Sequence, residues 1–153
     1  KLSLTYKGIS ESVLTDEKWL GFVIGQILSN ALKYTRADGI HIYLKDVNDS
    51  HQNSDNLSDT VISSTSTATD TATSITLIIE DTGIGIREED LPRIFEKGYT
   101  GVNGRENNRA TGIGLYLSQK IMNRLGHHIY ITSEEGTGTK VFLEFSRKDL
   151  MMY

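Results

Sequence analysis

The chain has 153 residues, of which 37% are hydrophobic and 24% are charged, and its formal net charge is −4. This length suits one domain with its own core, and the mild acidity argues against a protein that coats nucleic acid. The lack of cysteine excludes a disulfide framework and a cysteine-ligated zinc site, and it fits a reducing compartment. No apolar run approaches the roughly 18 residues of a membrane-spanning helix, and the chain begins at Lys1 without a visible signal peptide. We expect a soluble single domain over residues 1–153, cut from a longer protein.

The first part of the chain predicts two short strands and a long helix. Residues 2–6 and 11–14 alternate weakly, as short strands do. Thr15-Asp16 provides a side-chain oxygen ahead of an acidic first turn, which favours a helix start. From Glu17 to about Thr35, apolar residues recur at the spacing of an amphipathic helix. These residues are Leu20, Val23, Ile24, Ile27, Leu28, Ala31 and Leu32.

The composition changes sharply after this helix. Gly39 is suited to end the helix, and residues 40–46 then alternate as a strand. Between 48 and 74, twenty of 27 residues are Ser, Thr, Asp or Asn, so the stretch cannot bury enough apolar area to offset the ordering of its backbone. We expect a mobile hairpin insertion there, with a recognition loop for a partner as the alternative. The apolar run Ile75–Glu80 predicts a buried strand that ends at Asp81.

The second half of the chain predicts two helices and two strands. Pro92 is tolerated in the first turn or so of a short helix, and Gly126 suits the end of a long one. The expected elements, in order, are a short acidic helix over 88–95, a flexible connection over 96–111, a long helix from 112–114 to Leu125, and strands at 129–131 and 141–145. This order favours an α+β fold, a two-layer α/β sandwich with one mixed β-sheet and about three helices on one face, over a doubly wound parallel sheet.

A polar stripe runs along the first predicted helix. Gln26, Asn30 and Lys33 fall at i, i+4 and i+7 on one face, and Tyr34 lies at its edge. Such a stripe is most often just the solvated side of a helix. This one combines an amide oxygen suited to a hard metal, a cation suited to phosphate and an aromatic ring suited to stacking. Mg²⁺ takes few protein oxygens besides phosphates and water, so a single Asn is chemically sufficient.

The segment Asp81-Thr82-Gly83-Ile84-Gly85-Ile86 follows a predicted strand. A carboxylate at the strand end can accept a hydrogen bond from the exocyclic amine of adenine, and the glycines let a flat base approach the backbone. The alternative is a strand-to-loop turn with a capping Asp. The segment is not a Rossmann fingerprint, because no glycine-rich turn links a strand directly to a helix within a βαβ unit.

The segment Thr111-Gly112-Ile113-Gly114-Leu115 opens the second long helix. Helix N-termini bind phosphate through free N–H groups and the helix dipole. The residues just before it carry Lys97, Arg105 and Arg109 against one acid, Glu106. A flexible basic segment beside a phosphate site is what a ligand-ordered lid would look like.

Four segments in fixed order therefore describe a pocket for a nucleoside triphosphate and a metal ion: 26–34, 81–86, 111–115 and the turn Gly136–Thr139. They resemble the N, G1, G2 and G3 boxes of the ATP-binding (catalytic) domain of bacterial sensor histidine kinases, in the superfamily that includes gyrase B, the Hsp90 chaperones and MutL. Residues 91–96 resemble the F box. The resemblance covers roughly Leu14 to Phe145 apart from the insertion, and it implies a Bergerat-type ATP-binding fold.

A narrower resemblance lies in residues 94–101, 103–105 and 111–117. These segments are similar to those of the intramembrane-sensing kinases of Gram-positive bacteria that respond to bacitracin, lantibiotics and other cationic peptides. The wider resemblance implies that Phe95 would anchor the lid and that Arg105, or Arg109 in its place, would be the lid arginine that meets the phosphates.

The wider resemblance implies ligand roles for individual residues. Asn30 would bind Mg²⁺, Asp81 would bind the adenine amine, and Thr139 would support Asp81. No residue of this chain would be catalytic by itself. The residues implied to contact ATP are Asn30, Lys33, Tyr34, Asp81, Gly83, Gly85, Ile86, Arg105, Gly112, Gly114, Leu115 and Thr139.

Position 26 and the histidines indicate which reaction such a pocket serves. ATP-hydrolysing members of the superfamily place a glutamate four residues before the metal-binding Asn, whereas Gln26 is an amide without useful basicity. This favours phosphoryl transfer to a histidine on a separate dimerisation domain, with this domain supplying positioning and charge stabilisation. None of the four histidines fits the acceptor, so the chain alone should not phosphorylate itself. They are His41, His51, His127 and His128.

The resemblance also implies partners that lie outside this chain. They are the acceptor-histidine dimerisation domain of the same protein and, through the full-length kinase, the receiver domain of a response regulator. The full-length protein would be a homodimeric cell-membrane kinase of a two-component system with this domain in the cytoplasm, and no nucleic acid is expected. Two alternatives stay open: an ATP-hydrolysing conformational switch of the gyrase B or Hsp90 class, and a binding-only pseudokinase domain.

Overall fold

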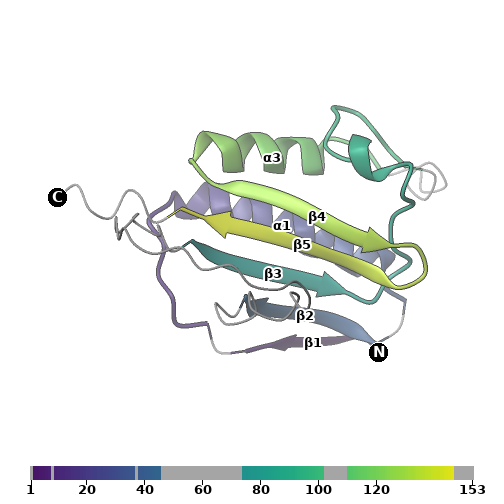
Figure 1. The fold of residues 1–153 in the computed structure, drawn as a ribbon, viewed down its shortest axis with the longest axis horizontal. Coiled ribbons are helices and arrows are strands. Elements are labelled where there is room, and N and C mark those ends of the chain that lie inside the picture. The colour runs from purple at the N-terminus through teal and green to yellow at the C-terminus, as the bar shows by residue number, and fades with distance from the viewer. Residues whose placement is uncertain (1, 8, 37, 46–73, 102–109, 147–153) are drawn as a thin grey trace, which may run out of the picture.

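The computed structural model describes residues 2–7, 9–36, 38–45, 74–101 and 110–146. Within them a five-stranded sheet carries two α-helices on one face (Figure 1). The strand order is β1-β2-β3-β5-β4; β1 and β2 are parallel and the other neighbours are antiparallel. The strands are β1 (Ser3–Tyr6), β2 (Gly39–Leu44), β3 (Ile75–Asp81), β4 (His128–Glu134) and β5 (Gly138–Phe145). The expected α+β sandwich with a mixed sheet is confirmed.

Helix α1 (Glu17–Tyr34) matches the predicted long helix. The Asp16 carboxylate caps it by accepting hydrogen bonds from the backbone N–H groups of Lys18 (3.0 Å) and Trp19 (3.1 Å). The helix buries its apolar stripe against the sheet. It ends at Tyr34, well before Gly39, so the expectation that Gly39 stops the helix is wrong. Gly39 opens β2 instead, where a Cβ atom would lie 2.3 Å from the Ser3 hydroxyl on β1.

Helix α3 (Gly114–Arg124) packs beside α1 and against β4. Gly126 follows its end with φ of 74°, the left-handed conformation expected of a helix stop. The core between helices and sheet consists of apolar residues from both layers. Its fully or almost fully buried members are Val23, Ile27, Ala31, Ile40, Ile79, Met122, Val141, Leu143 and Phe145.

Two expected elements are absent from the described residues. Residues 11–14 form no strand; they lead into α1, and Val13 packs against the core. The expected helix over 88–95 is only the 3₁₀ turn η2 (Leu91–Arg93). The turn contains hydrogen bonds between residues three apart, such as Arg93 N–H to the Asp90 carbonyl oxygen (3.0 Å). Pro92 has no N–H group, so it cannot donate the bond that an α-helix would need.

Three further expectations concern the number of helices, the predicted insertion and the absence of a membrane-spanning helix. Two α-helices and this 3₁₀ turn stand in the described ranges, where about three helices were expected. Of the insertion predicted at 48–74, all but Ser74 lies outside the described residues. Among the helices that are described, neither is long and apolar enough to cross a membrane.

Leu143 provides a test of the core, because it lies in the centre of β5 with 0% of its side chain exposed. We expect Leu143→Ala to lower the free energy of unfolding by about 2–5 kcal/mol, through lost apolar burial and the cavity left behind. Urea denaturation measures this. Leu32, on α1 but 58% exposed, is the matched control, and Leu32→Ala should change stability by less than about 0.5 kcal/mol. Equal effects of the two substitutions would contradict this core.

Candidate functional site

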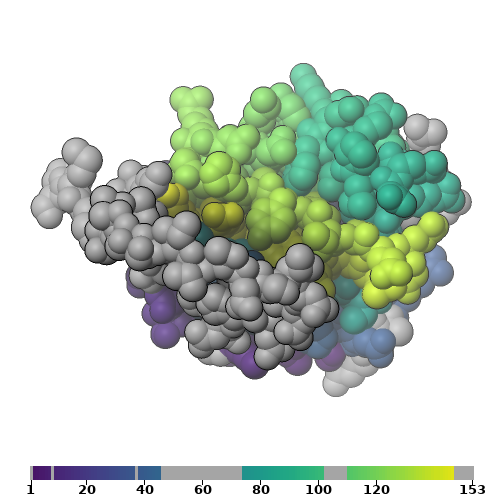
Figure 2. Space-filling view, in the orientation of Figure 1, coloured from purple at the N-terminus to yellow at the C-terminus, as the bar shows by residue number. Residues whose placement is uncertain are grey.

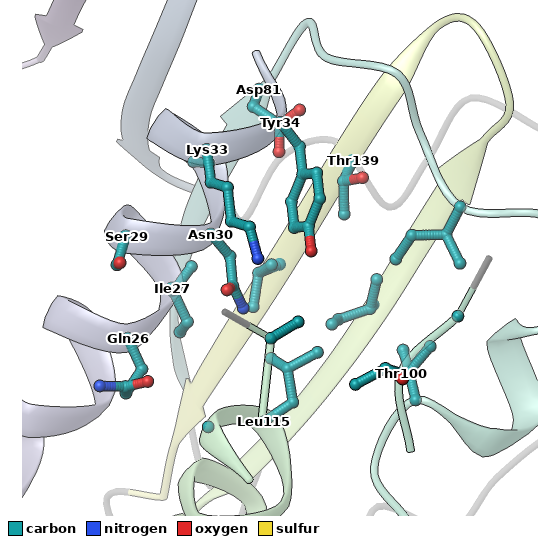
Figure 3. A pocket seen from close by; sticks show the side chains of 18 of the residues that line it. Gln26, Ile27, Ser29, Asn30, Lys33, Tyr34, Asp81, Thr100, Leu115 and Thr139 are labelled. Carbon is teal, nitrogen blue, oxygen red and sulfur yellow. The ribbon is translucent and has the colours of Figure 1, made fainter. Parts of the chain in front are cut away.

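A cavity of about 690 Å³ opens between α1, the ends of β3 and β5, the segment after β3 and the start of α3. Its volume lies in the range of about 300–1,000 Å³ that is usual for small-molecule sites. Figure 3 shows Asn30, Lys33 and Tyr34 reaching into it from α1, with Asp81 at one end and Leu115 at the other. The sequence-predicted residues that line it are Asn30, Lys33, Tyr34, Asp81, Gly85, Ile86, Gly112, Gly114, Leu115 and Thr139.

The remaining predicted residues lie elsewhere. Gly83 is not among the residues that line the cavity, and a Cβ atom there would come within 2.6 Å of the Asp81 Oδ1 atom. Phe95 packs against the core, and its neighbour Ile94 lines the cavity. Arg105 and Arg109 are outside the described residues.

Asp81 is a half-buried carboxylate at the end of β3. Burial raises the pKa of Asp81 above its ordinary value, and the charge of Glu80 adds to this. Hydrogen bonding opposes the rise: the Gly83 N–H donates to Oδ1 at 2.8 Å, and the Thr139 N–H also contributes. The carboxylate is therefore held in a fixed orientation beside the cavity.

The turn after β3 packs tightly on the hairpin that joins β4 to β5. Gly85 has φ of 70°, and a Cβ atom there would lie 2.0 Å from the Glu134 carbonyl oxygen. Only glycine permits this approach. The Gly136 N–H donates to the Ile84 carbonyl at 2.8 Å across the same contact. The glycine of this turn thus brings two backbone segments together at the Asp81 end of the cavity.

Ser133 links these segments, although no sequence motif marked it. Its hydroxyl donates to the Gly138 carbonyl (2.7 Å) and accepts from the Ile86 N–H (2.8 Å). Because its single proton is used, the Thr139 hydroxyl donates to Ser133 at 2.9 Å. Thr139 therefore faces Asp81 with its backbone N–H and is fixed by Ser133 through its side chain. The feature that could have identified Ser133 is the register of β4 with β5, which places Ser133 opposite Thr139.

The opposite end of the cavity is lined by α1 and the start of α3. The Lys33 Nζ atom lies 4.9 Å from the centroid of the Tyr34 ring. Gly114 lies under Gln26, whose Oε1 atom would be 2.5 Å from a Cβ at that position. Helix α3 has no side-chain cap at Ile113, so no side chain of the cap competes for its first N–H groups. The Lys33 ammonium group and the N-terminus of α3 thus both line this part of the cavity, which suits an anion.

The donor set suits a metal ion that is bound mainly by its ligand. Within the described residues, no group of three or more His, Cys, Asp or Glu side chains could hold a metal. Asn30 lines the cavity as a neutral oxygen donor. Mg²⁺ takes one or two protein oxygens besides phosphates and water, so the residues present fit it only together with a phosphate ligand.

Residues of the segment 90–101 also line the cavity, although no ligand role was predicted for them. They are Asp90, Ile94, Tyr99, Thr100 and Gly101. A wall built from 3₁₀ turns and glycine has no periodic pattern to mark it in the sequence.

Comparison with known proteins agrees with this geometry. Residues 15–149 match the family model described as histidine kinase-, DNA gyrase B- and HSP90-like ATPase. The chain belongs to this family. Together with a curated relative, this match confirms the resemblance to the catalytic domain of sensor histidine kinases. Among curated relatives, the sensor protein kinase GraS of Staphylococcus aureus (strain JH1) is 37% identical over 90% of this chain. The chain spans 33% of the length of that relative.

Solved structures support the same fold. Full-length ShkA in complex with AMPPNP superposes with a TM-score of 0.65 at 18% identity, over 95% of this chain and 25% of that one. The catalytic domain of the histidine kinase ThkA, in a nucleotide-free form, gives 0.64 at 19% identity, over 94% of this chain and 78% of that one. At these identities the likeness concerns the fold.

The raised pKa of Asp81 predicts a pH-dependent effect on stability. A carboxyl group whose folded-state pKa is raised favours folding below its ordinary pKa of 3.8, and this contribution is lost as pH rises through the folded-state value. At neutral pH the ionised group therefore costs stability. We expect Asp81→Asn, which keeps a hydrogen-bond acceptor, to raise the melting temperature at pH 7 and to lose this advantage below about pH 4. Thermal denaturation at both pH values measures it.

The exposed Asp38 offers a matched control for this experiment. Its side chain lies on the surface between α1 and β2, so Asp38→Asn should leave the melting temperature unchanged at either pH. A lower melting temperature of Asp81→Asn at pH 7 would contradict the assignment of burial as the dominant influence on Asp81.

Proposed function

We propose that this chain binds Mg²⁺-ATP and presents the γ-phosphoryl group to a histidine on another domain of a two-component sensor kinase. The observation that carries the proposal is the polarity of the cavity. A fixed carboxylate, Asp81, lies at one end, and the anion-suited groups Asn30, Lys33 and the N-terminus of α3 lie along the wall toward the other. This is the order in which adenine, ribose and phosphates follow one another in ATP.

Asp81 favours adenine because it can only accept hydrogen bonds while it is ionised. The exocyclic amine of adenine is a donor, whereas guanine has an acceptor oxygen at that position. The Tyr34 ring, the Ile86 side chain and the backbone of Gly85 line this part of the cavity, where the base would lie. The Ser133–Thr139 hydrogen bond keeps this end rigid, so binding a ligand costs little further conformational entropy there.

At the phosphate end, the residues supply charge compensation. Asn30 would provide the protein ligand of Mg²⁺, which when bound neutralises phosphate charge. Lys33, now over the Tyr34 ring, is a flexible cation within reach of the same region. Gly112 and Gly114 let the backbone N–H groups at the start of α3 approach the phosphates closely.

The described part of the chain contains neither a general base for ATP hydrolysis nor a histidine suited to accept the phosphoryl group. Gln26 cannot act as a general base for water. His127 is 2% exposed and shares a hydrogen bond with the Thr15 hydroxyl. His41 and His128 lie on strands, and His51 is outside the described residues. The acceptor histidine would then belong to a dimerisation domain, and a response-regulator receiver domain would be the onward partner of a homodimeric membrane kinase. The intramembrane-sensing subtype, suggested by the segments from 94 to 117, is part of this proposal, and GraS comes from a Gram-positive bacterium.

Calorimetry with a non-hydrolysable ATP analogue and Mg²⁺ tests the adenine end. In Asp81→Asn the amide oxygen keeps the Gly83 N–H and the NH₂ group faces the adenine amine, so two donors oppose each other. We expect the affinity to fall by about tenfold or more. Asp38→Asn, the same change on the surface, should bind as the unchanged chain does. Equal affinity of Asp81→Asn and the unchanged chain would sink the proposed orientation of the nucleotide.

A second titration tests the metal ligand. We expect Asn30→Ala to abolish most of the gain in affinity that Mg²⁺ gives the unchanged chain, because the one protein oxygen proposed for the ion is removed. Ser29→Ala, the neighbouring change on α1, should keep the Mg²⁺ effect. A Mg²⁺ gain that persists in Asn30→Ala would refute this ligand. Steady ATP turnover by the unchanged chain would instead favour the hydrolytic switch.

A further inference from the structure

The cavity wall across from α1 contains a buried carboxylate with an unusual partner. Asp90 is 8% exposed and stands at the N-terminus of η2. An aspartate in that position ordinarily caps the turn, but η2 receives no side-chain capping hydrogen bond. The Asp90 carboxylate accepts a hydrogen bond from the Tyr99 hydroxyl instead. The ion pairs found among the described residues do not include Asp90.

Tyr99 is held at both ends of its side chain. Its ring lies under the Arg93 guanidinium, with 4.3 Å between Cζ and the ring centroid. Arg93 is itself paired with Glu96 at 3.1 Å. The Tyr99 backbone N–H donates to the Glu96 carbonyl at 3.2 Å. The hydroxyl on Asp90 and the ring under Arg93 together fix one orientation of this side chain.

The backbone that follows Tyr99 is fixed against the same carboxylate. A Cβ atom at Gly101 would lie 2.7 Å from the Asp90 Oδ2 atom, so glycine alone fits without a shift of that side chain. On the other side, the Gly98 N–H donates to the Gly112 carbonyl at 3.0 Å. Figure 2 shows the corresponding teal and green segments packed side by side. The wall of residues 99–101 is therefore attached both to Asp90 and to the residues that precede α3.

This wall lies at the phosphate end of the proposed site. Asp90, Tyr99 and Gly101 all line the cavity. In Figure 3, Thr100 lies across the cavity from Gln26 and Asn30 and far from Asp81, with Leu115 between the two sides. The position of the wall consequently sets the width of the cavity next to Asn30, and not next to the adenine end.

We propose that Asp90 and Tyr99 are positioning residues that set the width and charge of the phosphate end, and that the Tyr99 hydroxyl limits a repulsion by the Asp90 carboxylate that would weaken binding of a nucleoside triphosphate more than of a diphosphate. This rests on the proposed function. The Tyr99 hydroxyl satisfies the Asp90 carboxylate and keeps it on the wall. Without that donor, an uncompensated negative charge would face the phosphates, at a cost that rises with the charge of the ligand.

The test compares Tyr99→Phe with the unchanged chain by calorimetry, with Mg²⁺ and either a non-hydrolysable ATP analogue or ADP. Tyr99→Phe keeps the ring under Arg93 and removes only the hydroxyl. We expect affinity for the ATP analogue to fall by about tenfold and affinity for ADP by less than about threefold. Adding Asp90→Asn to Tyr99→Phe removes the charge and should restore most of the lost affinity. Tyr130→Phe, on β4 away from the cavity, is the matched control and should change neither.

The outcomes are distinct. Three results would overturn the proposal: equal losses of affinity for both ligands, no loss for either, or a double variant that binds the ATP analogue as weakly as Tyr99→Phe. In each case, ADP binding that depends on Asp81 would still support the proposed function. Binding of neither ligand by the unchanged chain would overturn the proposed function itself. If Tyr99→Phe fails to fold, Gly101→Ala probes the same wall, because a Cβ there would displace the Asp90 carboxylate from its position beside Tyr99. It should show the same selective loss for the ATP analogue, and an unselective loss would count against the proposal.

Discussion

The backbone contact between the end of β3 and the β4–β5 hairpin determines where the cavity lies. A Cβ atom at Gly138 would be 2.0 Å from the Asp81 carbonyl oxygen, and one at Gly85 would be equally close to the Glu134 carbonyl. Two chain segments distant in sequence are therefore in backbone contact, which no other residue type allows. This contact orients Asp81, because its strand is paired with β5 up to Thr139. The carboxylate then lies under Thr35 at the end of α1, and the rest of the site is arranged from that point.

The two ends of the cavity are built on different principles. The Asp81 end is rigid: the hydroxyls of Ser133 and Thr139 and several backbone N–H groups are all used in hydrogen bonds. The opposite end depends on charge and on backbone attachment, with the Lys33 ammonium group along α1 and the wall of residues 99–101 held by Asp90. A rigid end suits recognition of a flat base with one orientation. An end whose charge depends on a few side-chain contacts suits discrimination between ligands of different charge.

Much of the fold could be read from local patterns. The apolar spacing from Leu20 to Leu32 predicted α1 because a 3.6-residue period is a property of consecutive residues. The alternation in Val141–Phe145 marked β5 for the same reason. The 88–95 helix and the 11–14 strand were wrong because each rests on weak local propensity, which packing and the missing N–H of Pro92 override. The cavity lining at Asn30, Lys33, Asp81 and Gly112 was likewise anticipated from residue types and order.

The sequence by itself thus determined the secondary elements with strong periodicity, the family resemblance and the residue types that meet in the cavity. Only the tertiary structure decided which of them share a wall. Gly83 lies behind Asp81, Ser133 fixes Thr139, and Asp90 holds Tyr99, none of which follows a helical or strand period. Such contacts depend on the register of β3 with β5 and on the packing of the segment 90–101 against the start of α3. Register and packing are set by the whole core at once, so local spacing cannot encode them.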